Sequence, residues 1–230
     1  MILWAAVFGM FLLKKDSRLH QISFDARDAR GRQKRFVVVL GFTAILLAGA
    51  FFSVRINPAC RQNLAVHHAQ YQELAEALSE GKVSVGDAEE ALLAMKNPYD
   101  TIALQAAGIG YRADYAYYNG KYYVYFGIVP VLLLYLPYYL LTGGALQNYV
   151  AVFVFFAGFI IAAAGFVYEL MKRYFKEQPF YLWAVGTGML VGSYSMFYLL
   201  IRPDLYHVPI VASAMFATGG LWLYLAGLNR

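Results

Sequence analysis

Three aspartates in this chain of 230 residues adjoin apolar stretches, where an ionised carboxylate is rare: Asp100, Asp114 and Asp204. A carboxylate in contact with a bound hydroxyl group can take its proton and so act as a general base. Ionisable groups near the end of an apolar span are often functional, although capping the span is their commoner role. We therefore treat Asp100 and Asp114 as candidate catalytic residues and Asp204 as a candidate substrate contact.

Basic side chains accompany these acids. Arg112 and Lys121 lie on either side of Asp114, and Arg202 lies just before Asp204. Cations in such positions can stabilise the charge of a phosphate group. Their commoner role is to reach along the apolar surface to lipid headgroups. The candidate substrate-binding residues are Arg112, Lys121, Tyr122, Arg202, Asp204 and His207.

Metal chemistry has little support in the sequence. His67 and His68 are adjacent, but two histidines without a third histidine or a cysteine nearby usually form the polar face of a helix. No metal site is therefore predicted, and nothing in the sequence identifies a cofactor. Cys60 is the single cysteine, so an intramolecular disulfide is excluded.

The composition indicates a membrane protein. Hydrophobic residues make up 60% of the chain and charged residues only 14%, which excludes an ordinary soluble domain. The net charge of +5 resides in segments that flank apolar runs, so a lipid bilayer is the expected partner and nucleic acid is not. We predict an all-α, polytopic helical protein of the cell membrane.

Four full spans are predicted from uninterrupted apolar runs of about 20 residues. They are Phe36–Val54, Asn148–Leu170, Phe180–Ile201 and Val208–Leu228. Met1–Leu13 is shorter and is predicted to be a short N-terminal helix in the membrane. Lys14–Arg35 carries eight basic residues against three aspartates, so the positive-inside rule predicts that it is cytoplasmic.

The parity of the spans decides how Tyr123–Leu141 is interpreted. If it crossed the membrane, the basic stretch Lys172–Lys176 would lie outside, against the positive-inside rule. Pro130 and Pro137 also interrupt it, as in a broken helix that protein supports. We predict that it is interfacial or re-entrant. The chain then divides into residues 1–35, with the short helix and basic loop, and a membrane domain 36–230 with an extracytoplasmic loop 55–147.

Within that loop we expect amphipathic surface helices. Apolar residues recur at helical spacing from Leu64 to Leu78, and Asp87–Glu90 resembles a capping box that would open a second helix. The tyrosine-rich stretch Asp114–Thr142 contains Asn119-Gly120, a pair that favours a tight turn because both residues tolerate positive φ. Five acids are predicted to be solvated faces of the surface helices: Glu73, Glu76, Glu80, Glu89 and Glu90.

A family resemblance is carried by three motifs in a fixed order. Tyr71–Gly81 follows the pattern Y-x-x-L-A-x-A-L-x-x-G, Asn97–Asp100 reads N-P-Y-D, and Gly120–Pro130 reads G-K-Y-Y-x-Y-F-G-x-x-P. This layout resembles the first outer loop of C-type (GT-C) integral membrane glycosyltransferases, including bacterial relatives of the protein O-mannosyltransferases and lipid A aminoarabinose transferase. The resemblance covers roughly residues 36–228, as in the N-terminal part of such an enzyme.

The resemblance implies sugar transfer from a polyprenyl-phosphate carrier to a hydroxyl of an acceptor glycan, lipid or protein on the outer face of the membrane. An aspartate would act as general base, and basic groups would stabilise the departing lipid phosphate. The family usually places its acid just before the Tyr71 motif, where this chain has Ala65–Gln70 and no acid. The alternative is a non-catalytic multi-pass scaffold or lipid-carrier-binding subunit. A secondary transporter is less favoured, because the spans lack buried charges.

Overall fold

The computed structural model describes residue 24 and residues 29–61, 69–193 and 196–229. Backbone contacts divide the chain into two units. The first, called here the helical unit, combines residues 1–61, 152–202 and 210–230, and the second, the loop unit, combines residues 62–151 and 203–209. The predicted N-terminal helix Met1–Leu13 and the pair His67 and His68 lie outside the described residues.

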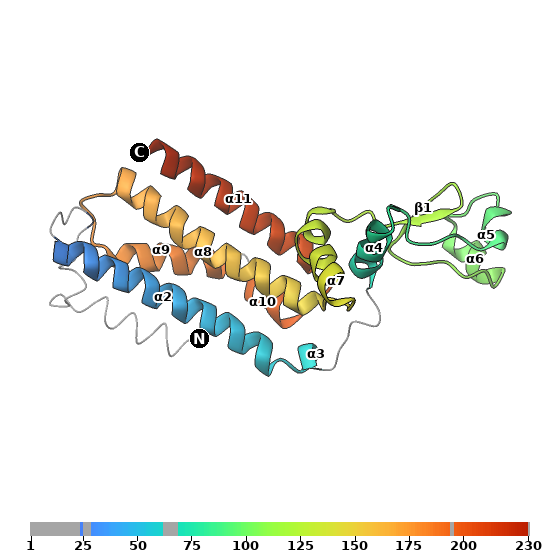
Figure 1. The fold of residues 1–230 in the computed structure, drawn as a ribbon, viewed down its shortest axis with the longest axis horizontal. Coiled ribbons are helices and arrows are strands. Elements are labelled where there is room, and N and C mark those ends of the chain that lie inside the picture. Colours follow the sequence, from blue (N-terminus) through green and yellow to red (C-terminus); the bar gives the residue numbers. More distant parts are fainter. Residues whose placement is uncertain (1–23, 25–28, 62–68, 194–195, 230) are drawn as a thin grey trace. The chain divides into compact units, whose positions relative to one another are not determined.

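Long apolar helices and shorter ones build the helical unit (Figure 1). Their bounds are α2 Ala29–Ile56, α3 Pro58–Arg61, α8 Asn148–Tyr174, α9 Tyr181–Ser193, α10 Met196–Ile201 and α11 His207–Leu228. Among the described residues, three helices are long and apolar enough to cross a membrane: Gly31–Ile56, Asn148–Tyr174 and His207–Leu228. The prediction of a mostly helical chain with apolar spans is therefore confirmed. The predicted span Phe180–Ile201 contains α9 and α10, each shorter than a span, and residues 194 and 195 between them are not described.

Helices α8 and α11 run parallel and in close contact. A Cβ atom added to Gly158 would lie 2.2 Å from Met215 Sδ, and one added to Gly165 would lie 2.2 Å from Trp222 Cε2. The two glycines and their two partners have the same spacing along their helices, so the helices point the same way. Arg173 Nη1 donates to the Leu228 carbonyl at 2.9 Å and joins their C-terminal ends. The glycines thus let large side chains of α11 lie against the backbone of α8.

Helix α2 runs antiparallel to α8. The Phe51 ring near its end lies 6.1 Å from Phe153 near the start of α8, while Phe24, just before α2, lies 5.3 Å from Tyr168 near the end of α8. Asn57 Nδ2 donates to the carbonyls of Leu200 and Ile201 at 3.3 and 2.6 Å, after the end of α2. The chain therefore leaves α2 and enters α8 at the same end of the helical unit.

An aromatic core closes the opposite end of the helical unit. Phe180 stacks on Trp183 with ring centroids 5.8 Å apart, and Phe24 packs against Phe180 at 4.8 Å. The indole N–H of Trp183, which is fully buried, donates to the Ala164 carbonyl at 2.9 Å. This pairing satisfies a polar group that would otherwise be costly inside an apolar core.

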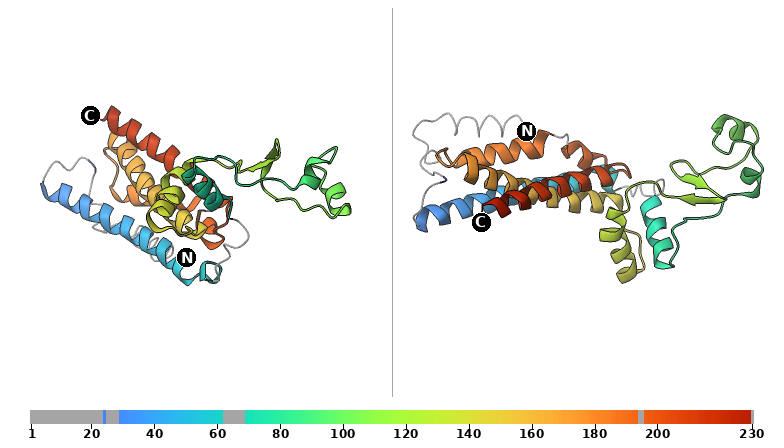
Figure 2. Two further views of the ribbon diagram at one scale, coloured as in Figure 1. Left: turned by 45° about the vertical axis from the view of Figure 1, so that its right-hand side comes forward. Right: turned by 90° about the horizontal axis from the view of Figure 1, so that it is seen from above.

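The loop unit contains short helices and one hairpin (Figure 2). Their bounds are α4 Gln70–Ser79, α5 Glu90–Leu93, α6 Thr101–Ala106, β1 Ala116–Tyr118, β2 Lys121–Tyr123, the π-helical turn η3 Val131–Tyr135 and α7 Leu136–Thr142. Asn119 and Gly120 join the strands with φ of 47° and 79°. Positive φ at both central residues is what a tight two-residue hairpin turn requires, so the predicted turn is confirmed.

The predicted capping box at Asp87–Glu90 is wrong. Helix α5 begins at Glu90, its N-cap Glu89 makes no side-chain cap, and the helix has one turn. Its apolar residues do not share one buried face either, since Leu92 is 1% exposed and Leu93 is 53% exposed. The reason is a backbone pairing: the N–H groups of residues 85 and 88 donate to carbonyls of residues 122 and 120. This pairing keeps Asp87 extended beside the hairpin.

The apolar run after the hairpin is a short helix, Val131–Thr142, in place of a span. Twelve residues of helix cover about 18 Å, well below the roughly 30 Å of a bilayer core. Pro130 stands at its start, and Pro137 lies in the first turn of α7, where the missing N–H of proline is tolerated. The helix packs against α4, where the Tyr71 and Tyr135 rings lie 5.3 Å apart.

Replacing Gly165 by Ala tests the contact between α8 and α11. Its Cβ would displace the rigid indole of Trp222, so we expect Gly165→Ala to lower the free energy of unfolding by about 1–3 kcal/mol in detergent. Gly220→Ala is the control, because nothing lies within 4 Å of its added Cβ and alanine favours a helix. Equal thermal unfolding temperatures of the two variants would contradict the close contact between Gly165 and Trp222.

Candidate functional site

Asp114 lies in a strained turn just before β1. Its φ is +62°, a value that few residues other than glycine adopt. Strained backbone of this kind persists only where its surroundings hold it, and it clusters at functional sites. Here two tyrosine hydroxyl groups meet the carboxylate. Tyr125 Oη lies 3.5 Å from Oδ1, and Tyr206 also donates a side-chain hydrogen bond to Asp114.

Phe126 holds these tyrosines in place. Tyr125 stacks on Phe126 with centroids 4.4 Å apart, and the Tyr206 ring meets Phe126 edge-on at 5.4 Å. Phe126 also contacts Tyr71 of α4 at 6.2 Å. One aromatic ring therefore connects α4, the segment after β2 and the turn formed by residues 203–209. The rings restrict the positions of the two hydroxyl groups that approach Asp114.

The turn at residues 203–209 adds a second acid and a histidine. Asp204 Oδ1 accepts the Leu205 backbone N–H at 2.7 Å, and His207 Nδ1 accepts the Asp204 backbone N–H at 3.3 Å. Leu205 is fully buried and fixes the turn. Through Tyr206, the structure thus brings three of the predicted site residues into one neighbourhood: Asp114, Asp204 and His207. We call these residues, together with Tyr125 and Tyr206, the Asp114 cluster.

The electrostatics of the cluster keep both tyrosines protonated near neutral pH. The hydrogen bond to Asp114 raises the pKa of Tyr206 to about 12, with smaller contributions from burial and from the charges of Asp114 and Asp204. Burial and the Asp114 carboxylate also raise the pKa of Tyr125. Both hydroxyl groups therefore act as hydrogen-bond donors. A third hydroxyl group, from a bound acceptor, would find an oxygen acceptor on Asp114.

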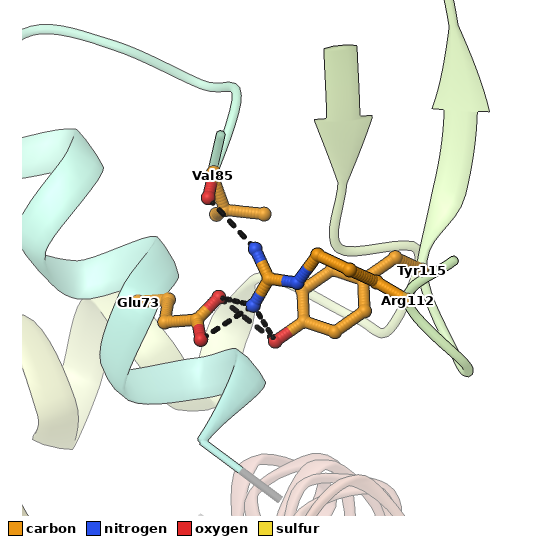
Figure 3. Close-up of polar contacts among 4 residues, drawn as sticks. All are labelled: Glu73, Val85, Arg112 and Tyr115. Atoms are coloured by element: carbon orange, nitrogen blue, oxygen red, sulfur yellow. Dashed lines mark hydrogen bonds and ion pairs between the residues drawn. The ribbon is translucent and has the colours of Figure 1, made fainter. Parts of the chain in front are cut away.

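A separate ion pair ties α4 to the segment before the hairpin (Figure 3). Arg112 Nη2 lies 2.6 Å from Glu73 Oε1 and 2.8 Å from Tyr115 Oη, and Nη1 donates to the Val85 carbonyl at 3.0 Å. Tyr115 Oη in turn donates to Glu73 Oε2 at 2.8 Å. The guanidinium carbon stands 4.0 Å from the centre of the Tyr115 ring and 5.8 Å from that of Tyr122.

This ion pair corrects one sequence prediction and bears on another. Glu73 was expected on a solvated face, but its side chain is only 29% exposed and its partner is 39 positions away. Arg112 was expected to contact a phosphate, and a phosphate there would have to compete with Glu73, Tyr115 and Val85. Phosphate binding by Arg112 stays a prediction.

The remaining predicted site residues have partners of their own outside the Asp114 cluster. Asp100 is the N-cap of α6, with Oδ1 accepting the Ala103 N–H at 3.0 Å. Lys121 is exposed on β2, and Tyr122 is 5% exposed in a small core with Leu92 and Leu104. Arg202, at the end of α10 in the helical unit, donates to Tyr198 Oη at 3.4 Å. Substrate contacts by these residues stay predictions.

Sequence reasoning missed the aromatic part of the cluster. Tyr125 and Phe126 stand within the motif G-K-Y-Y-x-Y-F-G, and Tyr206 stands between Asp204 and His207. Their positions in those motifs were the available signal. Tyrosine is so common in this chain that the sequence did not distinguish Tyr125 and Tyr206 from the others. Among the described residues, no group of three or more His, Cys, Asp or Glu side chains could hold a metal ion.

Loss of the Glu73 carboxylate should destabilise the loop unit. Glu73→Gln leaves the Arg112 guanidinium half-buried without its counter-charge, which we expect to cost roughly 1–2 kcal/mol, because about a third of each side chain still meets solvent. Limited proteolysis and thermal unfolding would measure the loss. The matched control is Glu90→Gln, an exposed glutamate at the start of α5, and an equal effect of both changes would refute a specific role for the ion pair.

The alkaline titration of Tyr206 reports on its hydrogen bond. Its pKa in the folded protein is raised, so the stabilisation is present below the ordinary value of about 10 and is lost as pH rises through 12. We expect Asp114→Asn to lower the pKa of Tyr206 toward 10, measured as the tyrosinate absorbance lost on Tyr206→Phe in each background. An unchanged pKa in Asp114→Asn would show that the two side chains do not interact.

No family model, no curated protein and no solved structure matches the chain. The geometry of its own residues is therefore the basis for the functional argument that follows.

Proposed function

We propose that this chain is a membrane glycosyltransferase, or the membrane portion of one, that moves a sugar from a polyprenyl-phosphate carrier to an acceptor hydroxyl. The observation that carries the proposal is the Asp114 cluster: a carboxylate in a strained turn, with two protonated tyrosines and a second acid beside it. The resemblance of the Tyr71 and Gly120–Pro130 motifs to C-type glycosyltransferases supports this choice of chemistry.

The proposed topology has four spans, with the basic ends in the cytoplasm. Residues 57–147 begin and end at one end of the helical unit, because α2 and α8 are antiparallel. That arrangement favours an even number of membrane crossings between α2 and α8. The short helix Val131–Thr142 fits this requirement if it is re-entrant or interfacial and does not cross the membrane. Arg32, Lys34 and Arg35 at the start of α2 lie at the same end as Lys172 and Arg173. The positive-inside rule assigns that end to the cytoplasm and the loop unit to the outer face.

The proposed reaction needs one base and one stabilised leaving group. Asp114 takes the proton of the acceptor hydroxyl as its oxygen bonds to the anomeric carbon of the sugar. The bond between that carbon and the carrier phosphate breaks, and the phosphate leaves with the electron pair. Tyr125 and Tyr206 fix the carboxylate so that one of its oxygens faces the acceptor. Lys121, which belongs to the loop unit as Asp114 does, is the candidate cation for the departing phosphate.

A non-catalytic role is the second candidate, and specific contacts favour it. Asp100 caps a helix and Arg112 is held by Glu73, so two of the predicted site residues have structural partners. A scaffold or carrier-binding subunit would need the fold of the loop unit but no base.

Substitution of Asp114 separates the two functions. We expect Asp114→Asn to reduce transfer of labelled sugar from polyprenyl phosphate by roughly 100-fold or more, since general-base catalysis contributes about 10²–10⁴-fold. Asp100→Asn is the control, because asparagine caps a helix about as well as aspartate. Full activity of Asp114→Asn, or loss confined to Asp100→Asn, would reject Asp114 as the base. Folded but inactive wild-type protein, assayed at its full gene-encoded length, would favour the scaffold.

A further inference from the structure

A cleft of about 800 Å³ opens within the helical unit between α2, α8 and α11. Its volume falls in the range of about 300–1,000 Å³ that is typical of ligand sites. Most of the wall is apolar, with Val39, Leu40 and Leu47 of α2 facing Ile161 of α8 and Trp222 of α11. Gly165 makes room for the Trp222 indole against the α8 backbone. The walls suit a hydrocarbon chain better than a polar ligand.

One end of the cleft is charged. Arg32 and Arg35 of α2 line it together with Tyr168 and Glu169 of α8. The Glu169 carboxylate has two partners of its own. Asn229 Nδ2 donates to Oε2 at 2.6 Å, and Lys172 Nζ lies 3.4 Å from the same oxygen. Arg35 is largely buried, and its Nη1 donates to the Phe24 carbonyl at 2.9 Å. Among the described side chains that line this end, the two cationic residues Arg32 and Arg35 outnumber the one acid, Glu169.

The charged end and the apolar part of the cleft lie at different positions along the helices. Arg32 and Arg35 lie in the first two turns of α2, while Leu47 lies about 18 Å further along the same helix. The positive end lies beside Lys172 and Arg173 at the end of α8, which together form the basic end of the helical unit. A ligand that fills the cleft must therefore be an amphiphile with an anionic head at the basic end and an apolar tail directed toward the middle of the helices.

We infer that this cleft binds one anionic glycerophospholipid, with its phosphate against Arg32 and Arg35 and an acyl chain along Leu40, Leu47 and Trp222. Charge complementarity selects the lipid, since guanidinium groups bind phosphate through two N–H donors and a zwitterionic headgroup offers less net charge. Headgroup attraction is favourable at about 1 kcal/mol per basic residue near an anionic membrane surface. None of the residues that line the cleft belongs to the Asp114 cluster, so the inference does not depend on the proposed transfer reaction.

Lipid retention by the purified full chain tests the headgroup contact. Wild-type protein is reconstituted in phosphatidylcholine vesicles containing a minor fraction of phosphatidylglycerol, re-extracted in mild detergent, and analysed by native mass spectrometry. We expect one retained phosphatidylglycerol per chain, and about tenfold weaker retention for Arg32→Gln, because charge-assisted hydrogen bonds are lost. Lys34→Gln removes the same charge from the exposed side of the same helix turn and should retain the lipid.

A second pair of variants tests the apolar part. Ala44 lines the cleft, whereas its neighbour Ile45 is exposed and does not. Ala44→Trp should fill the tail region and abolish retention, while Ile45→Trp should leave it unchanged. Equal retention within either pair would overturn the proposal, as would phosphatidylcholine retained as well as phosphatidylglycerol. Absence of bound lipid from the wild-type chain would overturn it too.

Discussion

Two long helices that run in opposite directions, α2 and α8, constrain everything that lies between them in the sequence. Their pairing is fixed at both ends by aromatic contacts, Phe51 with Phe153 and Phe24 with Tyr168. A chain that leaves one such helix and enters the other at the same end cannot cross a bilayer an odd number of times in between. The hairpin, the short helix Val131–Thr142 and the Asp114 cluster all belong to that intervening stretch or contact it.

Within the loop unit, contacts between residues far apart in the sequence supply the stability that its short helices lack on their own. Helix α5 has one turn and α6 has six residues, too short to be stable in isolation. The Glu73–Arg112 pair and the Phe126 ring join segments that are tens of residues apart. The strained turn at Asp114 depends on this scaffold, because a positive φ at a non-glycine residue costs about 1–3 kcal/mol and must be offset by its surroundings.

Local patterns in the sequence predicted those parts of the fold that depend only on residues close together in the chain. Apolar runs identified α2, α8 and α11, and Asn119-Gly120 identified a turn, because length and positive φ are properties of a few neighbouring residues. The capping box failed because Asp87 is held beside the hairpin by backbone pairing with residues far along the chain. Glu73 was misjudged for the same reason: its partner Arg112 comes from another element. The hydrogen bond between Tyr206 and Asp114 joins residues that are far apart in the sequence, so no local pattern predicts it.

In the proposed topology, the loop unit and the basic ends of α2 and α8 lie on opposite sides of one membrane. Labelling of single cysteines with a membrane-impermeant reagent tests it most directly, in a Cys60→Ser background that removes the native thiol. We expect Lys82→Cys in the loop unit to be labelled from outside intact cells, while Lys34→Cys and Lys176→Cys should react only after the membrane is permeabilised. Labelling of Lys82→Cys and Lys176→Cys from the same side would contradict it, because Val131–Thr142 would then have to belong to a crossing segment.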